Sequence, residues 1–249
     1  LILLCFYLIL TATHQAYAAP KPGSLPVGPQ PLTITAVELK EQKIILDWQE
    51  ETTLVKGLYT LSNPTGKKLK VTLGMPGKNI LGDGVNMPKL YISAGENNIK
   101  TKYDKKYGMY TWDLPFNPEE SLELRVEYEM TNSFSEQGHA LTGYDFSNDQ
   151  KWTDKPIITS LTLNFKEVHP GQIKDISPSN YSISGNSLVW KWMEPPPGSY
   201  VCVTADIAGE KNTWLSKLSD QQRREIMSLL ENKSYLEAAS LLGQGKQKA

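Results

Sequence analysis

The chain has 249 residues, enough for one large domain or two small ones. Its 26 Lys and Arg and 27 Asp and Glu give a formal net charge of −1. We see no basic stripe or polybasic run, which argues against a nucleic-acid or acidic-lipid partner. Cys5 falls in the apolar N-terminal run and Cys202 stands alone after it, so we expect no internal disulfide.

The first eighteen residues have the pattern of an export signal. Residues 1–12 form a nearly unbroken apolar run, followed by Ala-Tyr-Ala at residues 16–18, which fits a signal-peptidase site. The run is shorter than the about 20 apolar residues of a membrane-spanning helix. We predict a signal peptide over residues 1–18 and an extracytoplasmic protein, secreted or attached to a bacterial cell envelope. Because the chain opens on Leu1 rather than Met, we expect it to begin inside this leader. The sequence leaves open whether the leader is cleaved or kept as an anchor.

Residues 19–31 form a Pro-rich stretch after the predicted leader. They contain five prolines and two glycines. Proline fixes φ and removes a backbone donor, so such a stretch does not fit the interior of a sheet. We predict an extended linker over residues 19–31, followed by a β domain over residues 32–209.

Four segments of this domain alternate apolar and polar residues, which is typical of half-buried antiparallel strands. The clearest is 122–130, where Leu, Val, Tyr and Met alternate with Glu and Arg. The others are 68–73, 161–166 and 201–207, and the last alternation points Cys202 away from the core. Turn signals are frequent and no helical stretch intervenes. The sequence therefore predicts a mainly β fold, an antiparallel β-sandwich that could divide into two sub-sandwiches.

The sharpest turn signal is Ser-Gly-Asn-Ser at residues 184–187. Gly185 and Asn186 can supply the positive φ values that a two-residue hairpin loop needs. We predict that this turn joins two short antiparallel strands, 181–184 and 188–192.

Residues 218–249 differ from the β domain. Capping-box sequences begin at Ser219 and Ser234, and each is followed by apolar residues at helical spacing. This pattern predicts a short C-terminal helical hairpin. Helices of this length are marginal alone, so we expect the tail to dock on the β domain or, alternatively, to bind a protein partner.

Catalytic and metal-binding motifs are absent from the sequence. After the leader the chain contains two histidines, His139 and His169, and no G-x-S-x-G nucleophile elbow. Asp145, Asn148 and Asp149 form an oxygen-rich cluster. It fits a polar turn better than a calcium loop, because the calcium-loop spacing is missing. We therefore expect no catalytic residue, no metal and no cofactor.

Aromatic side chains offer the one binding signal. Trp190 and Trp192 share a strand face with an apolar neighbour, and we expect them in the core. Trp112 and Trp152 lie near turns, where an indole ring can stack on a sugar or contact a peptide. The candidate binding residues are therefore Trp112, Asp145, Asp149 and Trp152.

Several motifs between residues 58 and 207 match a known pattern. They are a strand with an Asn-containing turn (59–63), a strand ending in Pro (71–76), an aromatic strand (110–112), a segment opening on Trp (152–165) and a hairpin followed by Pro (185–197). In these motifs the chain resembles a family of secreted bacterial β-sandwich domains of unknown function. The resemblance implies the fold and carries over no catalytic residue.

These features predict a non-catalytic binding or structural domain that recognises an envelope protein or a polysaccharide through loops or an exposed sheet. The alternative is a carbohydrate-active hydrolase that uses paired carboxylates. Adjacent carboxylates occur at residues 50–51 and 119–120, but adjacency does not place two carboxyl groups across a cleft. A third alternative is a structural spacer attached to an assembly through residues 218–249. We expect neither nucleic acid as a partner nor a membrane span after the leader.

Overall fold

The computed structural model describes residues 25–76, 90–134, 139–152, 156–196 and 198–207. These residues form sixteen strands and two short 3-10 helices, so the predicted mainly β class is confirmed. The predicted signal peptide (1–18) and the predicted helical tail (218–249) lie outside them. No helix within the described ranges has the length and hydropathy needed to cross a membrane.

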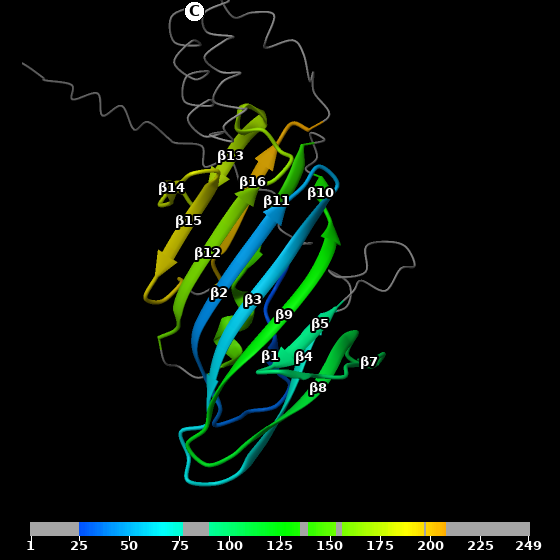
Figure 1. Ribbon diagram of the computed structural model, residues 1–249, viewed down its shortest axis with the longest axis vertical. Helices are drawn as coiled ribbons and strands as arrows, with labels where there is room; N and C mark the ends of the chain where they lie inside the picture. The colour runs from blue at the N-terminus through cyan, green and yellow to red at the C-terminus, as the bar shows by residue number, and fades with distance from the viewer. Residues whose placement is uncertain (1–24, 77–89, 135–138, 153–155, 197, 208–249) are drawn as a thin grey trace, which may run out of the picture.

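The strands form three sheets (Figure 1). The largest has the order β14 (Ser182–Ser184), β15 (Ser187–Trp192), β12 (Ile158–Phe165), β2 (Glu38–Trp48), β3 (Thr52–Ser62), β9 (Ser121–Thr131), β5 (Tyr91–Ala94) and β6 (Asn97–Asn98). A four-stranded sheet has the order β1 (Gln30–Pro31), β4 (Leu69–Pro76), β8 (Met109–Phe116) and β7 (Lys102–Asp104). The other has the order β10 (Ser133–Phe134), β11 (Ala140–Asp145), β16 (Tyr200–Ala205) and β13 (Ile173–Ser177). The 3-10 helices are η1 (Ser147–Lys151) and η2 (Pro170–Gln172).

Period-two burial accounts for the long strands of the largest sheet. β9 buries Leu124 and Val126 and exposes Glu123 and Arg125, as the alternation at 122–130 predicts. Apolar side chains that leave water on one face stabilise each strand against the layer beneath it. The other predicted strands are found as β4, β12 and β16.

The predicted hairpin at residues 184–187 is present. Ser184 pairs with Ser187 across a two-residue loop that joins β14 to β15. Gly185 has φ +55, whereas Asn186 keeps a negative φ. One positive φ, supplied by the first loop residue, is the pattern of a hairpin turn with Gly in that position.

One strand pair departs from the predicted antiparallel arrangement. β2 and β12 run parallel, from Glu41 opposite Ile158 to Trp48 opposite Phe165. Parallel neighbours need a long connection, and here the intervening chain supplies strands to all three sheets. Local alternation indicates that a strand is half-buried but carries no signal for the direction of its neighbour, so this pair could not be predicted.

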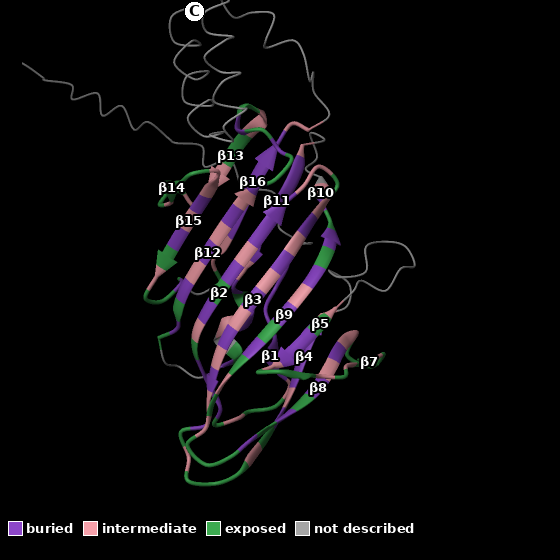
Figure 2. Ribbon diagram, viewed as in Figure 1, coloured by how far each residue is buried: buried purple, intermediate pink, exposed green. Residues whose placement is uncertain are grey.

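A single hydrophobic cluster connects the inner faces of the three sheets. It includes Leu46 of β2 and Trp190 of β15, Leu73 of β4 and Val203 of β16. Each buried side chain of this size contributes on the order of 1.5–3 kcal/mol relative to exposure. Figure 2 shows buried positions recurring along the strands of the large sheet. The prediction that Trp190 lies in the core is confirmed, and Trp192 is half-buried against the same cluster.

The N-terminal segment, defined here as residues 25–31, differs from its prediction as linker. All seven residues are buried. β1 pairs with β4, with Gln30 opposite Gly74, and Leu32 donates a backbone hydrogen bond to Thr72 at 3.0 Å. Proline is compatible with this position because β1 is an edge strand. The expectation of an extended linker is therefore wrong from residue 25 onward.

Cys202 points away from the main core, as predicted, but it is buried. The alternation in β16 points this side chain away from the main core, but residues 201–205 are all buried. Cys202 packs with Leu25 and Leu141 in a second small cluster. The N-terminal segment thus covers the sheet face on which Cys202 lies, so a side chain that points away from the main core is nevertheless buried.

Candidate functional site

The predicted site residues between 145 and 152 hold the N-terminal segment. Val27 forms a parallel bridge with Asp145, whose backbone N donates to Pro26 O at 2.8 Å. The Asn148 side-chain amide donates to Gly28 O at 3.0 Å. The Trp152 indole N–H donates to Pro29 O at 3.2 Å. Side-chain donors therefore satisfy carbonyls of a segment whose prolines limit regular pairing.

The two tryptophans predicted as binding residues are both buried. Trp112 is 3% exposed and Trp152 is 7% exposed. Trp112 points inward from β8, where it pairs with Leu73 in β4. A ring that stacks on a ligand must present a face to solvent, so a surface binding role does not fit either indole. The sequence alone could not show that Trp112 and Trp152 are buried, because both indoles have polar neighbours in the chain, as exposed rings do.

Asp149 lies in a polar group beneath the N-terminal segment. Its carboxylate accepts a hydrogen bond from the Gln42 side-chain amide at 2.5 Å, and the same amide lies 3.1 Å from the Thr159 hydroxyl. Burial raises the pKa of Asp149 to about 7, and the charge of Asp145 acts in the same direction, while the Gln42 hydrogen bond opposes both. The predicted pair Asp145 and Asp149 is thus brought close, with Asp145 also accepting from the Ser147 backbone N at 2.7 Å.

Three tyrosines extend this polar group into the core. The hydroxyl groups of Tyr59 and Tyr144 lie 2.9 Å apart, and both side chains are buried. Burial raises the pKa of Tyr59, Tyr128 and Tyr144 above the ordinary value, so all three phenols stay neutral near pH 7. Within the described residues the Tyr128 hydroxyl has no hydrogen-bond partner. The side chains of this polar group can hold protons and make polar contacts. Their described hydrogen bonds, however, join strands and segments of the fold to one another.

Metal ligation is not indicated in the described part of the chain. No group of three or more His, Cys, Asp and Glu side chains there could hold an ion. Cys202 lies in the small cluster with Leu25, and burial raises its thiol pKa to about 12. His169 precedes η2, where its backbone N donates to the Gln172 side chain at 2.8 Å.

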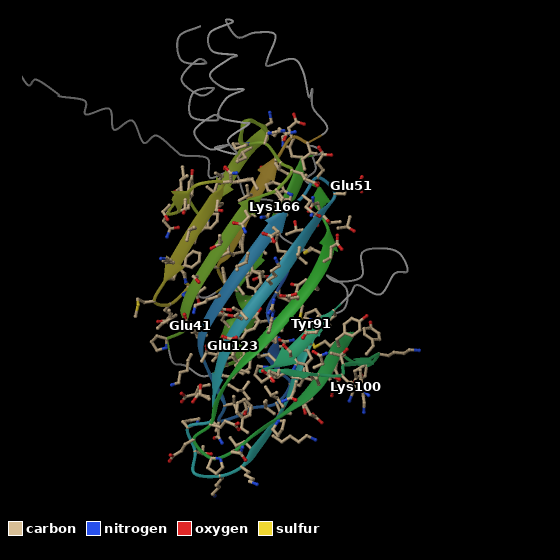
Figure 3. The ribbon with its side chains drawn as sticks, viewed as in Figure 1. Glu41, Glu51, Tyr91, Lys100, Glu123 and Lys166 are labelled. Carbon is tan, nitrogen blue, oxygen red and sulfur yellow. The ribbon has the colours of Figure 1, made fainter. Side chains whose placement is uncertain are left out.

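The adjacent carboxylates at 119–120, considered above for a hydrolase, belong to a turn, and further glutamates lie on the adjoining strand β9. Glu119 adopts φ 58 in the turn between β8 and β9, and Glu120 accepts a hydrogen bond from the Asn117 backbone N at 2.5 Å. Glu123 stands on the outer face of β9, which Figure 3 shows turned to the viewer. Glu127 pairs with Arg125 at 2.5 Å on that strand. These carboxylates stabilise a turn or meet solvent.

Exposed aromatic rings gather on one short stretch. Tyr91 is 43% exposed, Tyr103 41% and Tyr107 54%. They are the exposed members among the Phe, Trp and Tyr side chains whose burial the structure describes. The Ile99 backbone N donates to Ile92 O at 2.8 Å, which ties the segment before β7 to β5. We call Tyr91, Tyr103 and Tyr107 the tyrosine edge; Figure 3 labels Tyr91 and Lys100 on this side of the molecule.

The β7–β8 hairpin fixes the middle ring of the tyrosine edge. Tyr103 pairs with Tyr110 across the two strands, and their ring centroids lie 5.1 Å apart at 57°. Tyr110 is buried, and that burial raises its pKa. At the turn, the Lys106 backbone N donates to the Asp104 carboxylate at 2.9 Å and Gly108 adopts φ +63. An anchored ring loses less side-chain entropy when a ligand binds.

Sequence reasoning missed the tyrosine edge. The signal was present: residues 100–110 contain four lysines and three tyrosines in a chain of net charge −1. Whole-chain charge balance conceals such a local cluster. Whether a Tyr is exposed also depends on strand order, which the alternation does not supply.

Comparisons with known proteins identify a fold but no family. No family model matches the chain, and no curated protein matches it. Among solved structures it is similar to a "putative nutrient binding protein" from Legionella pneumophila, with 15% identity, a TM-score of 0.60, and coverage of 84% of this chain and 82% of that chain. It is also similar to an M1 zinc metallopeptidase from Deinococcus radiodurans, with 12% identity, a TM-score of 0.44, and coverage of 68% of this chain and 42% of that chain. The Legionella likeness shows a shared fold, which supports a common β architecture and no closer family resemblance.

Proposed function

We propose that this chain is a non-catalytic extracytoplasmic binding protein, secreted or attached to a cell envelope, which recognises protein or polysaccharide at the tyrosine edge. The expected location follows from the export-signal pattern of residues 1–18. The similarity in fold to the Legionella protein, which is named for nutrient binding, supports a binding role. An antiparallel β-sandwich remains our proposal for how the three sheets are layered.

The observation that carries this proposal is the distribution of aromatic rings. The two predicted binding tryptophans are in the core, whereas the exposed rings of the described residues all lie between 91 and 107. Exposed aromatic side chains supply large contact area at low entropy cost and are enriched in binding surfaces. Tyr103 is also held by Tyr110, so its ring is positioned before a ligand arrives.

The alternative function, a carbohydrate-active hydrolase, has one observation in its favour. Burial raises the pKa of Asp149 to about 7, and a carboxyl group with a raised pKa is typical of the general acid in a glycosidase. Against it, the contacts of the 145–152 segment secure the N-terminal segment, with Asp145 bridging Val27 and Asn148 bonding Gly28. If the alternative holds, Asp149→Asn abolishes a hydrolytic activity that the wild-type protein shows on a polysaccharide panel.

Equilibrium binding to a panel of purified polysaccharides and envelope proteins tests the proposal. The full chain is compared with Tyr103→Ser/Tyr107→Ser and with a control, Ile183→Ser/Met193→Ser. The control residues are also exposed, at 60% and 74%, but lie outside the tyrosine edge. We expect wild type and control to bind the same panel member and the tyrosine variant to lose that binding. Equal binding by all three proteins, or hydrolysis of a panel member by the wild type, would overturn the proposal.

A further inference from the structure

Four lysines lie in the same stretch of chain as Tyr103 and Tyr107 of the tyrosine edge. Lys100, Lys102, Lys105 and Lys106 are all exposed. Asp104 is the one acidic residue between positions 100 and 110, so this stretch carries 4 − 1 = +3 charges in a chain of net charge −1. Such a local excess attracts polyanions although the whole chain is nearly neutral.

These lysines are available for a ligand. Among the described residues, no ion pair involves any of the four. Lys102 helps to lower the pKa of Asp113, but that carboxylate pairs with Lys70 at 2.7 Å. The Asp104 carboxylate is occupied in part by the Lys106 backbone N at 2.9 Å. Binding an anion therefore breaks no described ion pair of these lysines.

The hairpin combines this charge with rings. The Lys106 ammonium lies 5.0 Å from the centroid of the Tyr107 ring, which keeps a cation beside an exposed aromatic face. In β7, Lys102 and Tyr103 point to opposite faces of the strand, as successive strand residues do. β7 is the last strand in the order of its sheet, so an extended ligand can follow this edge and contact both faces.

We propose that the β7–β8 hairpin binds a polysaccharide that carries carboxylate groups. The lysine ammonium groups pair with the carboxylates as point charges, and the Tyr103 and Tyr107 rings contact the apolar faces of the sugar rings. The exposed large side chains between 100 and 110 are tyrosines and lysines, without an exposed Leu, Ile, Phe or Trp. An interfacial membrane anchor typically uses those apolar side chains, so a polymer fits this edge better than a lipid surface.

Affinity electrophoresis of the full chain tests this inference, which rests on the proposed function. The gels contain polygalacturonate, neutral dextran or a single-stranded oligothymidylate. The lysine variant is Lys102→Gln/Lys106→Gln. Its matched control is Lys67→Gln/Lys68→Gln, which removes two exposed lysines from the loop before β4. A further variant, Tyr103→Ser/Tyr107→Ser, keeps every charge.

We expect polygalacturonate, and not dextran, to retard the wild type and the Lys67/Lys68 control. The lysine variant should lose about tenfold in affinity, and the tyrosine variant about threefold at unchanged charge. Absence of retardation, equal loss in the Lys67/Lys68 control, or stronger retention by oligothymidylate would overturn the inference. Binding of a neutral polysaccharide that depends on Tyr103 and Tyr107 would overturn it as well, while leaving the proposed function in place.

Discussion

The phenol oxygens of Tyr59 and Tyr144 lie 2.9 Å apart inside the core. Tyr59 belongs to β3 of the eight-stranded sheet and Tyr144 to β11 of a four-stranded sheet, so this hydrogen bond joins two sheets. A hypothetical Cβ on Gly28 would lie 2.7 Å from the Tyr144 oxygen, which places the N-terminal segment directly over the pair. The segment, the pair and the two sheets therefore depend on one another.

Removing one hydroxyl from this pair should destabilise the fold. Tyr59→Phe leaves the Tyr144 hydroxyl buried without this partner, which costs about 1–3 kcal/mol. Urea unfolding followed by tryptophan fluorescence measures the change. Tyr107→Phe, at an exposed ring, is the control and should change stability by less than about 0.5 kcal/mol. Equal effects of the two substitutions would show that the buried hydrogen bond contributes nothing.

Gly28 should not tolerate a methyl group. Its Cβ would lie 2.7 Å from the Tyr144 oxygen and 3.3 Å from Tyr59 Cε1, and such overpacking costs about 1–3 kcal/mol. Gly66→Ala is a matched control because nothing lies within 4 Å of its Cβ; we expect it to be neutral or stabilising by up to about 1 kcal/mol. Thermal unfolding of both variants tests this prediction. An unchanged melting temperature for Gly28→Ala would show that residues 25–31 do not pack against Tyr59 and Tyr144.

Asp149 should make stability depend on pH. Burial raises its pKa from 3.8 to about 7, so the folded state holds this proton more tightly than the unfolded chain. Its stabilising contribution is therefore full below pH 3.8 and is lost as the pH rises through about 7. Asp149→Asn stays neutral, so its stability relative to wild type should increase from pH 5 to pH 8 in urea titrations.

The control for this titration is Asp113→Asn. Its partner Lys70 and the Thr72 hydroxyl hold the pKa of Asp113 below the ordinary value, so its contribution is lost only as the pH falls below that value. Between pH 5 and pH 8 the free energy of unfolding of Asp113→Asn should therefore change with pH in parallel with that of the wild type. If the Asp149→Asn curve also runs parallel to wild type, the Asp149 carboxyl is not desolvated as the structure indicates.

Cys202 should be an unreactive thiol in the folded protein. It is 3% exposed, and burial raises its pKa to about 12, so almost no thiolate is present near neutral pH. A disulfide-exchange reagent should modify it slowly in buffer and rapidly in denaturant. Fast modification of the folded protein, or an intermolecular disulfide on mass spectrometry, would contradict the observed packing against Leu25.

Local pattern was enough to predict the strands but not their arrangement. The alternation in β9 follows from which side chains leave water, and the sequence contains that information. The parallel pairing of β2 with β12 and the burial of Cys202 depend on contacts between distant segments. Proline content suggested a linker at 19–31, yet residues 25–31 are packed, because side chains at 145–152 donate hydrogen bonds to their carbonyl groups.

The candidate site also combines features that the sequence predicts with features that depend on the arrangement of distant segments. The sequence predicted Asp145, Asp149 and Trp152 as binding residues, because they are polar or aromatic and lie near predicted turns. The structure brings them together around the protein's own N-terminal segment. Tyr103 is exposed on β7, which is an edge strand, a property that no local pattern shows, and Tyr107 is exposed in the turn between β7 and β8.

The central claim is that residues 145–152 serve the fold while the tyrosine edge serves binding. Hydrogen–deuterium exchange of the full chain, with and without polygalacturonate, tests both parts in one experiment. We predict slow exchange at the non-proline residues of 25–31 and at residues 140–145 in both conditions, with ligand-dependent protection confined to residues 91–110, which contain the tyrosine edge. Fast exchange at 25–31 without ligand, together with ligand-dependent protection at 145–152, would contradict this account.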